Sequence, residues 1–314
     1  ANRAYAQNFL SKNGLRENDF IGILQVCKGL SLTDCYWVTY PDDQKTFAEV
    51  NLFDNRFSQV LSQIAFTGYG SSPVSKFRSS PEFTTNGMLP KAWRRKEGKV
   101  LLYKGGTSGL ANTGKEPYSE FYAAQVAEAM GIPHVTYGLS KWKGQLCSTC
   151  ELFTSKDVSF VPASTLINTS KISKIIDWYD DHGWKNDLAD MLVLDAIIRN
   201  TDRHLGNFGF LVDNHTNQLL RPAPVFDNGL SLYCYVMDND LNNLSEQEKT
   251  LAPALYANFD EVALHVIGQK QKQELRHLLT FRLKKHGRYN LSDERVKMLE
   301  SSIQEKARYL LESA

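Results

Sequence analysis

The chain has 314 residues, 42% hydrophobic and 23% charged, which is enough apolar material for a large buried core. Lys and Arg number 36 against 35 Asp and Glu, and this balance argues against direct nucleic-acid binding as the main role. No apolar run approaches the roughly 20 residues that span a bilayer, and no signal peptide is recognisable. We therefore expect a cytoplasmic protein without a membrane association, with export as an effector left open.

The first hundred residues mix apolar runs with turns. β-Branched and aromatic residues predict strands at 21–26 and 36–40, and helical spacing predicts one or two helices within 46–64. Ser, Pro, Gly and Thr then predict a loop over 68–98. The loop runs into a basic stretch that is typical of a solvated loop, made of Lys91, Arg94, Arg95, Lys96 and Lys99.

The middle of the chain predicts a strand, a helix and two more strands. The strand covers 100–104, and the helix covers 117–130 because Pro117 suits a first helical turn. Strands follow at 135–139 and 145–153. The second of these strands contains Cys147 and Cys150, a lone C-x-x-C without a second pair or a nearby His, which argues against a zinc site.

Beyond about residue 155 the pattern becomes helical. Helices are predicted at 164–180 and 184–200, a hairpin at 208–221, and three helical segments from 245 to the end. The chain thus reads as α+β, with a mixed lobe over residues 1–153 followed by a helical lobe over 154–314.

The densest polar cluster, residues 200–208, directly follows a buried apolar helix. Buried polar groups need partners, and a ligand or metal ion supplies them. Asp202 and Asn207 have the types and spacing that phosphoryl transfer needs: the Asp accepts a hydroxyl proton, and the Asn holds Mg²⁺ on the phosphates. Asp227, at a strand end, is a second metal ligand in this interpretation, although Asp-Asn-Gly alone is typical of an ordinary turn.

A cation for the nucleotide phosphates is expected from the first lobe. Lys104 ends a predicted strand, and Glu120 lies in the first turn of the next helix. A strand Lys oriented by a helix Glu positions phosphates in protein kinases. Glu116 and Glu128 are rivals of Glu120 for this role, and a simple surface-directed lysine is the alternative for Lys104.

Together these residues resemble the HipA-like serine/threonine kinases, a family that includes toxins of bacterial toxin–antitoxin pairs and shorter stand-alone relatives. The match runs from about Thr84 to Leu232 and covers about half the chain. The Asp-Arg-His order at residues 202–204 is also similar to that of phosphatidylinositol kinases. The resemblance implies a two-lobed protein-kinase-like fold and the cofactors ATP and Mg²⁺.

Site roles follow from the resemblance. It implies that Asp202 is the catalytic base, that Asn207 and Asp227 bind Mg²⁺, and that Glu120 orients Lys104 on a phosphate. Backbone groups near Glu151 and Phe153 are implied to bind the adenine. A G-x-G-x-x-G loop is absent, so the phosphates are expected to be covered by the stretch that contains Asn86, Gly87 and Met88.

The toxins phosphorylate a serine in their own phosphate-covering loop, which stops their activity. The resemblance therefore implies self-phosphorylation here, with Thr84, Thr85, Ser79 and Ser80 as candidates. It also implies an unidentified protein substrate, since toxin targets include aminoacyl-tRNA synthetases. An antitoxin partner is left open because the segment before the match is short.

Three other functions remain open. One is a lipid or small-molecule kinase, or a nucleotidyl transferase, on the same fold. Another is a pseudokinase that acts only by binding, which the intact set of Lys and acidic residues argues against. A metal-dependent hydrolase built on Asp195, Asp202 and His204 lacks a compact second ligand set.

Overall fold

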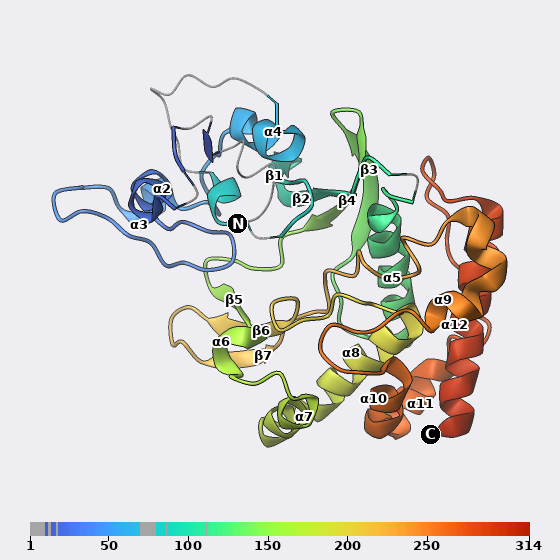
Figure 1. Cartoon of the computed structure of the whole chain (residues 1–314). Helices are drawn as coiled ribbons and strands as arrows, with labels where there is room; N and C mark the ends of the chain where they lie inside the picture. Colours follow the sequence, from blue (N-terminus) through green and yellow to red (C-terminus); the bar gives the residue numbers. More distant parts are fainter. Residues whose placement is uncertain (1–9, 12–13, 17, 70–79, 86, 111) are drawn as a thin grey trace. The chain divides into compact units, whose positions relative to one another are not determined.

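A computed structural model of the chain describes residues 10–11, 14–16, 18–69, 80–85, 87–110 and 112–314, and Figure 1 traces them. These residues form two compact units. The sheet unit comprises Ala1–Thr107, Lys141–Phe160 and Leu211–Leu219, and the helical unit comprises Ser108–Ser140, Val161–Phe210 and Leu220–Ala314. The sequence predicted one boundary after residue 153. The observed division is discontinuous instead, and the helix that carries Glu120 belongs to the helical unit because it packs against a helix there.

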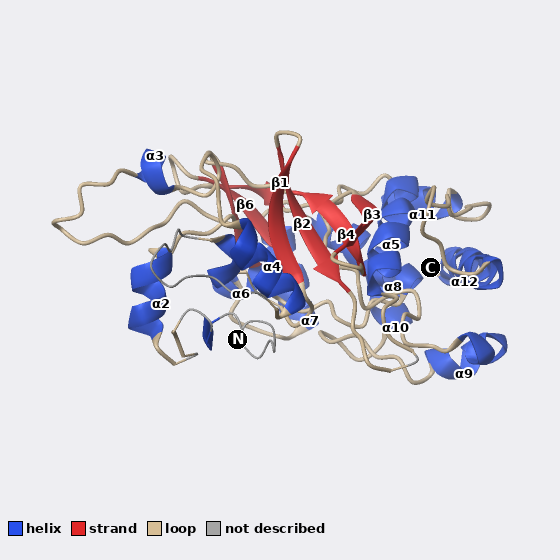
Figure 2. Cartoon of the chain, turned by 90° about the horizontal axis from the view of Figure 1, so that it is seen from above, coloured by secondary structure: helices blue, strands red, loops and turns tan. Residues whose placement is uncertain are grey.

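An antiparallel sheet forms the centre of the sheet unit. Strand β1 (Lys91–Lys96) pairs with β2 (Lys99–Gly105), and β2 pairs with β4 (Gln145–Glu151). The strand order is β1-β2-β4-β3, where β3 (Tyr137–Trp142) carries the chain from the helical unit into the sheet unit. Figure 2 shows these strands side by side, with helix α4 (Gln59–Thr67) beside β1.

Both faces of this sheet are buried by apolar side chains. On one face Val100, Trp93 and Leu152 pack with residues of the N-terminal segment such as Leu30 and Leu52. On the other face Ala92, Tyr103 and Cys147 pack with Phe66 of α4. Because side chains alternate along a strand, Cys147 and Cys150 point to opposite faces of β4, so their thiols do not converge on one metal ion.

The N-terminal segment departs from two sequence predictions. Residues 21–26 belong to helix α2 (Phe20–Cys27) rather than to a strand, and 36–40 form no regular element. The helix begins because the Asp19 carboxylate accepts a hydrogen bond from the Gly22 backbone N–H at 2.9 Å, and it ends at a left-handed Lys28. The two predicted helical segments within 46–64 are α3 (Phe47–Val50) and α4.

The basic stretch is also structured, which corrects the prediction of a solvated loop. It forms most of β1 and the first residue of β2. The Arg94 guanidinium lies 4.7 Å from the ring centre of Tyr103 and 4.5 Å from that of Trp142. Cationic side chains can pack on aromatic faces in this way, so a high density of charge did not require this stretch to be a solvated loop.

Helix α8 (Lys185–Ile198) is the core of the helical unit. Every residue from Leu188 to Ile198 is buried, as expected for a helix that is apolar on all sides. It contacts five other helices of the unit, which surround it in Figure 1. These are α5 (Glu116–Met130), α7 (Ile172–Asp181), α10 (Phe259–Val266), α11 (Gln269–Arg276) and α12 (Asp293–Ser313).

Shorter elements complete the fold. The predicted hairpin at 208–221 is confirmed as β6 (Gly209–Asp213) and β7 (Leu219–Pro222), and β5 (Val158–Pro162), which the sequence did not predict, adds to it in the order β5-β6-β7. No helix in the described part of the chain has both the length and the apolar character needed to cross a membrane. The remaining helical turns are η2 (Pro81–Phe83), α6 (Ala163–Leu166), η3 (Asp238–Asn243) and α9 (Leu244–Glu248).

Candidate active site

The predicted polar cluster is the loop that leaves helix α8. Arg199 ends the helix in a left-handed conformation (φ 54°), which turns the chain sharply. Asn200, Arg203 and Asn207 are then buried although they are polar. Buried polar groups persist only where they are paired, and each of these has partners in the helical unit.

Arg203 is the centre of the loop, with a side chain that is fully buried. Its Nε and Nη2 donate to the two carboxylate oxygens of Asp195, each at 2.9 Å. Its Nη1 donates to the carbonyl oxygens of Asn207 at 2.9 Å and Phe226 at 2.7 Å, and Nη2 donates to Asn228 Oδ1 at 2.6 Å. One guanidinium thus joins helix α8, the loop after it and the turn at 226–228.

Burial and charge oppose each other in this ion pair. Burial lowers the pKa of Arg203, but the charge of Asp195 and its hydrogen bonds outweigh burial and raise that pKa above its usual value. Burial in turn raises the pKa of Asp195, against the charge of Arg203. Both Asp195 oxygens accept hydrogen bonds from Arg203, and no described group of three or more His, Cys, Asp or Glu side chains could hold a metal ion, which argues against the hydrolase hypothesis.

Asp202 and Asn207, the predicted base and metal ligand, lie together. The Asn207 side-chain N–H₂ donates to the Asp202 carbonyl oxygen at 2.9 Å and, more weakly, to the Asp202 carboxylate at 3.4 Å. The Asp202 N–H donates to the Asn200 side chain at 3.1 Å. Among the described residues no hydrogen bond engages the amide oxygen of Asn207, which is the atom a hard cation would take.

Asp227 lies in the turn at 226–228, to which Arg203 also donates hydrogen bonds. Its φ of 57° is left-handed, a strained conformation for a residue other than glycine, although Asp tolerates it better than most. Its N–H donates to the Tyr137 hydroxyl at 3.2 Å. Arg203 donates to the Phe226 carbonyl and to the Asn228 side chain, on either side of Asp227, so one guanidinium holds both this turn and the loop of Asp202 and Asn207.

Glu120 is the member of its helix that reaches this network. It is fully buried in α5, and its carboxylate accepts a hydrogen bond from the Asn228 N–H at 2.8 Å. Its rival Glu116 accepts a hydrogen bond from the Tyr235 hydroxyl at 3.2 Å, and Glu128 is exposed. Glu120 therefore supports the residue next to Asp227, and its orientation of Lys104 stays a prediction.

Lys104, Glu151 and Phe153 belong to the sheet unit. Lys104 lies near the end of β2 with only 7% of its surface exposed. The Glu151 carboxylate accepts a hydrogen bond from Lys99 at 2.6 Å, and the Phe153 ring packs edge-on against Phe160 at 5.8 Å. Their roles toward phosphate and adenine stay predictions, because the acidic and amide residues belong to the other unit.

The predicted phosphate-covering stretch also belongs to the sheet unit, and Ser79 and Asn86 lie outside the described residues. The Thr84 hydroxyl donates to the Leu30 carbonyl at 3.0 Å, and the Thr85 hydroxyl donates to the Pro81 carbonyl at 2.7 Å and accepts from the Trp93 indole N–H at 3.1 Å. Ser80 is fully buried, whereas Met88 is 67% exposed.

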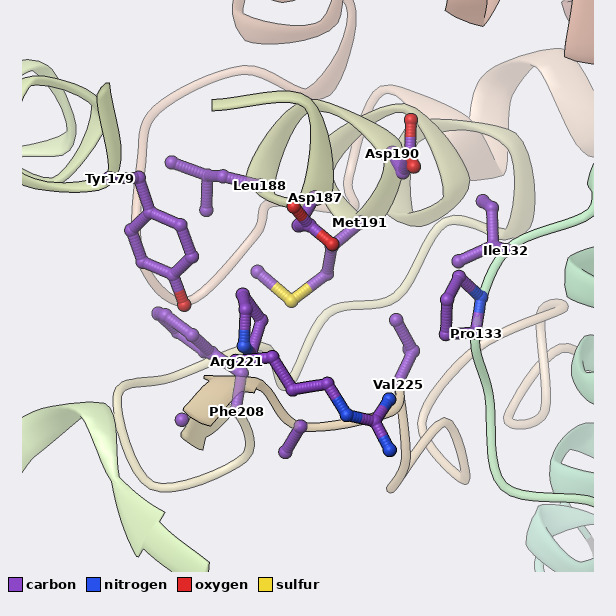
Figure 3. Close-up of a pocket in the computed structure, with 13 residues that line it drawn as sticks. Ile132, Pro133, Tyr179, Asp187, Leu188, Asp190, Met191, Phe208, Arg221 and Val225 are labelled. Atoms are coloured by element: carbon purple, nitrogen blue, oxygen red, sulfur yellow. The ribbon is translucent and has the colours of Figure 1, made fainter. Parts of the chain in front are cut away.

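A small cavity of about 50 Å³ lies elsewhere in the helical unit (Figure 3). Its walls include Tyr179, Asp187, Met191, Phe208 and Arg221. Burial, together with the charge of Asp190, raises the pKa of Asp187. The volume suits a few water molecules rather than a nucleotide. Since none of the predicted site residues lines it, this cavity is not the expected nucleotide site.

Sequence reasoning missed two scaffold roles in this site. Arg203 lies within the polar cluster, but it was not assigned a function, and Asn228 was treated only as a turn residue. The available signal was Asp195, an acidic residue inside the otherwise apolar segment 191–198, eight positions before Arg203. A carboxylate buried in an apolar helix needs a cation nearby, and Arg203 was the nearest candidate.

Comparisons with known proteins bear on the fold and on the resemblance to a family. No family model matches the chain. The sequence is 24% identical, over 196 residues, to the serine/threonine-protein kinase CtkA of Helicobacter pylori strain J99, covering 57% of this chain and 56% of CtkA. The aligned part therefore spans little more than half of that relative.

Superposition on solved structures identifies the fold of this chain. The H. pylori proinflammatory kinase CtkA superposes with a TM-score of 0.58 at 18% identity, over 73% of this chain and 91% of CtkA. The chain has the fold of the HipA-like kinases. HipA of Shewanella oneidensis MR-1, solved with HipB and operator DNA, superposes with a TM-score of 0.50 at 10% identity, over 98% of this chain and 83% of HipA. The predicted α+β kinase-like fold class is thereby confirmed, and homology to CtkA supports the resemblance to this family.

Proposed function

We propose that the chain is an ATP- and Mg²⁺-dependent protein kinase of the HipA-like type that phosphorylates serine or threonine. One observation carries this proposal: the buried Arg203 side chain holds both the loop of Asp202 and Asn207 and the turn that contains Asp227. The relative CtkA is named a serine/threonine kinase, which supports the same activity.

The donor set fits magnesium. Mg²⁺ takes oxygen ligands and usually completes its shell with phosphate and water, so one amide oxygen and one carboxylate suffice. Asn207 and Asp227 would hold the ion, which when bound neutralises the charge of the phosphates. This assignment uses an Asn207 amide oxygen that no described residue engages.

Asp202 has the remaining chemical role. Its carboxylate would accept the proton of the attacking serine or threonine hydroxyl, which makes that oxygen a better nucleophile. The hydrogen bond between Asp202 and Asn207 keeps the base beside the metal ligand, so proton acceptance and phosphate binding occur at adjacent atoms. Arg203 donates to the Asn207 backbone carbonyl, away from both functional side-chain groups, and acts by fixing the loop.

The activity is tested by transfer of label from γ-labelled ATP to proteins of a whole-cell lysate. Asp202→Asn should reduce transfer about 10²- to 10⁴-fold, because an amide cannot take the hydroxyl proton. Asp181→Asn, an exposed change in the helical unit, is the matched control and should transfer like the parent. If Asp202→Asn equals the parent, Asp202 is not the base.

The same assay separates the rival reactions on this fold. A nucleotidyl transferase would transfer label from α-labelled ATP and not from γ-labelled ATP. A lipid or small-molecule kinase would label only the organic extract of the lysate. Either result would contradict a protein kinase.

Self-phosphorylation forms part of the proposal, and the candidates differ in accessibility. The hydroxyls of Thr84 and Thr85 donate to backbone carbonyls, which a phosphate cannot do, so modification would break these bonds and release the stretch. Ser80 is fully buried and is the least accessible described candidate. Peptide mapping after incubation with Mg-ATP tests this, and the absence of added phosphate between Ser71 and Met88 would contradict it.

A protein partner of the antitoxin type is proposed from the comparison with HipA, which was solved with HipB. Purification of the tagged chain from its own cells should then yield one stoichiometric companion, identified by mass spectrometry. Recovery of the chain alone would contradict a stable antitoxin complex.

A further inference from the structure

The cavity of about 50 Å³ shown in Figure 3 lies entirely within the helical unit and has a mixed wall. Its apolar part includes Met191 of α8 and Phe208, which are each 5% exposed. Its polar part comes from the side chains of Tyr179, Asp187 and Arg221. A space of this size holds about four water molecules, so it admits only a ligand of comparable size.

Tyr179 brings a buried hydroxyl to this cavity. Its side chain is 2% exposed and packs on the rings of Phe208 and Phe210, and burial raises the pKa of its phenol. Within the described part of the chain no hydrogen bond engages this hydroxyl. Buried tyrosine hydroxyls normally have a partner, and a molecule in the cavity would supply one.

Asp187 lies in the first turn of α8, at the exposed mouth of the cavity. A carboxylate at a helix N-terminus ordinarily has a lowered pKa, because that end of the helix is positive. Burial, and after it the charge of Asp190, instead raise the pKa of Asp187. The nearby Lys270 forms ion pairs with Asp190 and Glu274, and no described cationic side chain forms an ion pair with Asp187.

Arg221 of β7 is the cation of the cavity wall. Its side chain is exposed, and its guanidinium forms no ion pair or hydrogen bond with any residue that the structure describes. Figure 3 shows Asp187 on the α8 side of the cavity and Arg221 on the opposite side. The charge of Arg221 acts on the pKa of Asp187, yet the two side chains are not in contact. The cavity thus separates two opposite charges.

We propose that this cavity binds a small zwitterion, a free amino acid with a short side chain, with its ammonium group at Asp187 and its carboxylate at Arg221. A guanidinium matches a carboxylate through two parallel hydrogen bonds, and an aspartate accepts from an ammonium group. The Tyr179 hydroxyl can donate or accept, and Met191 and Phe208 offer apolar contacts to the aliphatic carbons. A ligand with one charge would leave one of the two charged side chains without a partner.

The test measures binding of alanine to the full chain by ligand-observed NMR titration. Propionate and ethylammonium are measured beside it, because each lacks one of the two charged groups of alanine. Both should bind at least about 10-fold more weakly, which is the effect of losing one hydrogen bond to a charged group.

Variants of the polar wall assign the binding to this cavity. Arg221→Met and Asp187→Asn should each weaken alanine binding about 10- to 100-fold, and Tyr179→Phe should weaken it about 2- to 10-fold. Arg308→Met and Asp181→Asn remove the same groups from exposed positions of the helical unit outside the cavity wall, and they should match the parent. Circular dichroism in the absence of ligand checks that each variant is folded.

Three outcomes would overturn this site. One is equal affinity for alanine in the parent and in a folded Arg221→Met or Asp187→Asn variant. Another is propionate binding as tight as alanine binding, which would indicate a site for anions. The third is a parent that does not bind alanine at millimolar concentrations, since the cavity would then hold water alone. None of them bears on the kinase, whose test is phosphoryl transfer through Asp202.

Discussion

At the scale of single residues, Arg203 does more to build the candidate site than any residue assigned to chemistry. It is fully buried, and its hydrogen bonds join α8, the Asp202 loop and the Asp227 turn. A guanidinium suits this position because its planar group donates in several fixed directions at once, whereas a lysine carries one point charge. The identity of Arg203 thus sets the distance between the two loops.

We predict that Arg203→Met destabilises the protein by about 3 to 5 kcal/mol, because it leaves the Asp195 carboxylate charged and unpaired in the core. Urea denaturation followed by circular dichroism measures the change. Lys174→Met, which removes an exposed ion pair with Asp177 in the same unit, is the control and should change stability by about 1 kcal/mol or less.

The double variant Arg203→Met with Asp195→Leu separates the cost of the unpaired charge from the loss of loop contacts. It should regain part of the lost stability, since replacing both partners of a buried ion pair is often neutral. A single Arg203→Met variant as stable as the parent would contradict the central role of this ion pair.

The sequence grouped Asp202, Asn207 and Asp227 because phosphoryl transfer restricts the side chains that can serve it. The structure brings Asp202 and Asn207 together and ties the Asp227 turn to their loop, while the chemical roles of the three stay predictions. The support that Arg203 and Asn228 give depends on backbone carbonyls and on a turn distant in sequence. No local pattern encodes such contacts.

At the scale of elements, the sequence predicted β2 and α5 correctly but not α2 and β1. The apolar residues of β2 and the Pro117 start of α5 have local preferences that agree with the fold. α2 was wrongly predicted because its cap at Asp19 outweighs its content of strand-forming residues. β1 was wrongly predicted because pairing with β2 overrides its charge.

Arg95 illustrates how a basic strand stabilises the unit. Its guanidinium donates to the carbonyls of Leu52 at 2.8 Å, Phe53 at 2.5 Å and Asn55 at 3.2 Å. Burial lowers the pKa of Arg95 from its usual value, but an arginine remains protonated at neutral pH. The side chain therefore ties β1 to the turn that follows α3.

We predict that Arg95→Ala destabilises the protein by about 1.5 to 3 kcal/mol, because hydrogen bonds from a charged group to several carbonyls are lost. Lys96→Ala, the next residue on the same strand, is 58% exposed and should change stability by less than about 0.5 kcal/mol. Thermal and urea denaturation of the two variants measure the difference. Equal stability of both would mean that β1 tolerates Arg95 as a solvated residue, as the sequence alone predicted.

At the scale of the whole molecule, the predicted basic site residue belongs to one unit, and the predicted acidic and amide site residues belong to the other. The sheet unit contains Lys104, the predicted phosphate ligand, and the helical unit contains Asp202, Asn207 and Asp227, the predicted base and metal ligands. Phosphate binding and magnesium binding should therefore be separable by mutation, each through its own unit.

This separation leads to a prediction about thermal stability. Mg-ATP at about 100 times its dissociation constant should stabilise the parent by about 2.7 kcal/mol, which raises the unfolding midpoint by about 4 °C. Asp227→Ala should lose most of the increment that Mg²⁺ adds. The variant should keep the increment that ATP gives in EDTA, because Lys104 is intact and Asp227 is predicted to bind the metal ion rather than the phosphates.

Differential scanning fluorimetry with adenosine, ATP in EDTA, and Mg-ATP measures both increments in the parent and in Asp227→Ala. Asp181→Asn serves as the control for loss of an acidic side chain in the helical unit, and it should respond like the parent to all three conditions. A magnesium increment that survives in Asp227→Ala would assign the ion to other ligands. Loss of the response to metal-free ATP in the same variant would mean that Asp227 contributes to ATP binding without a metal ion.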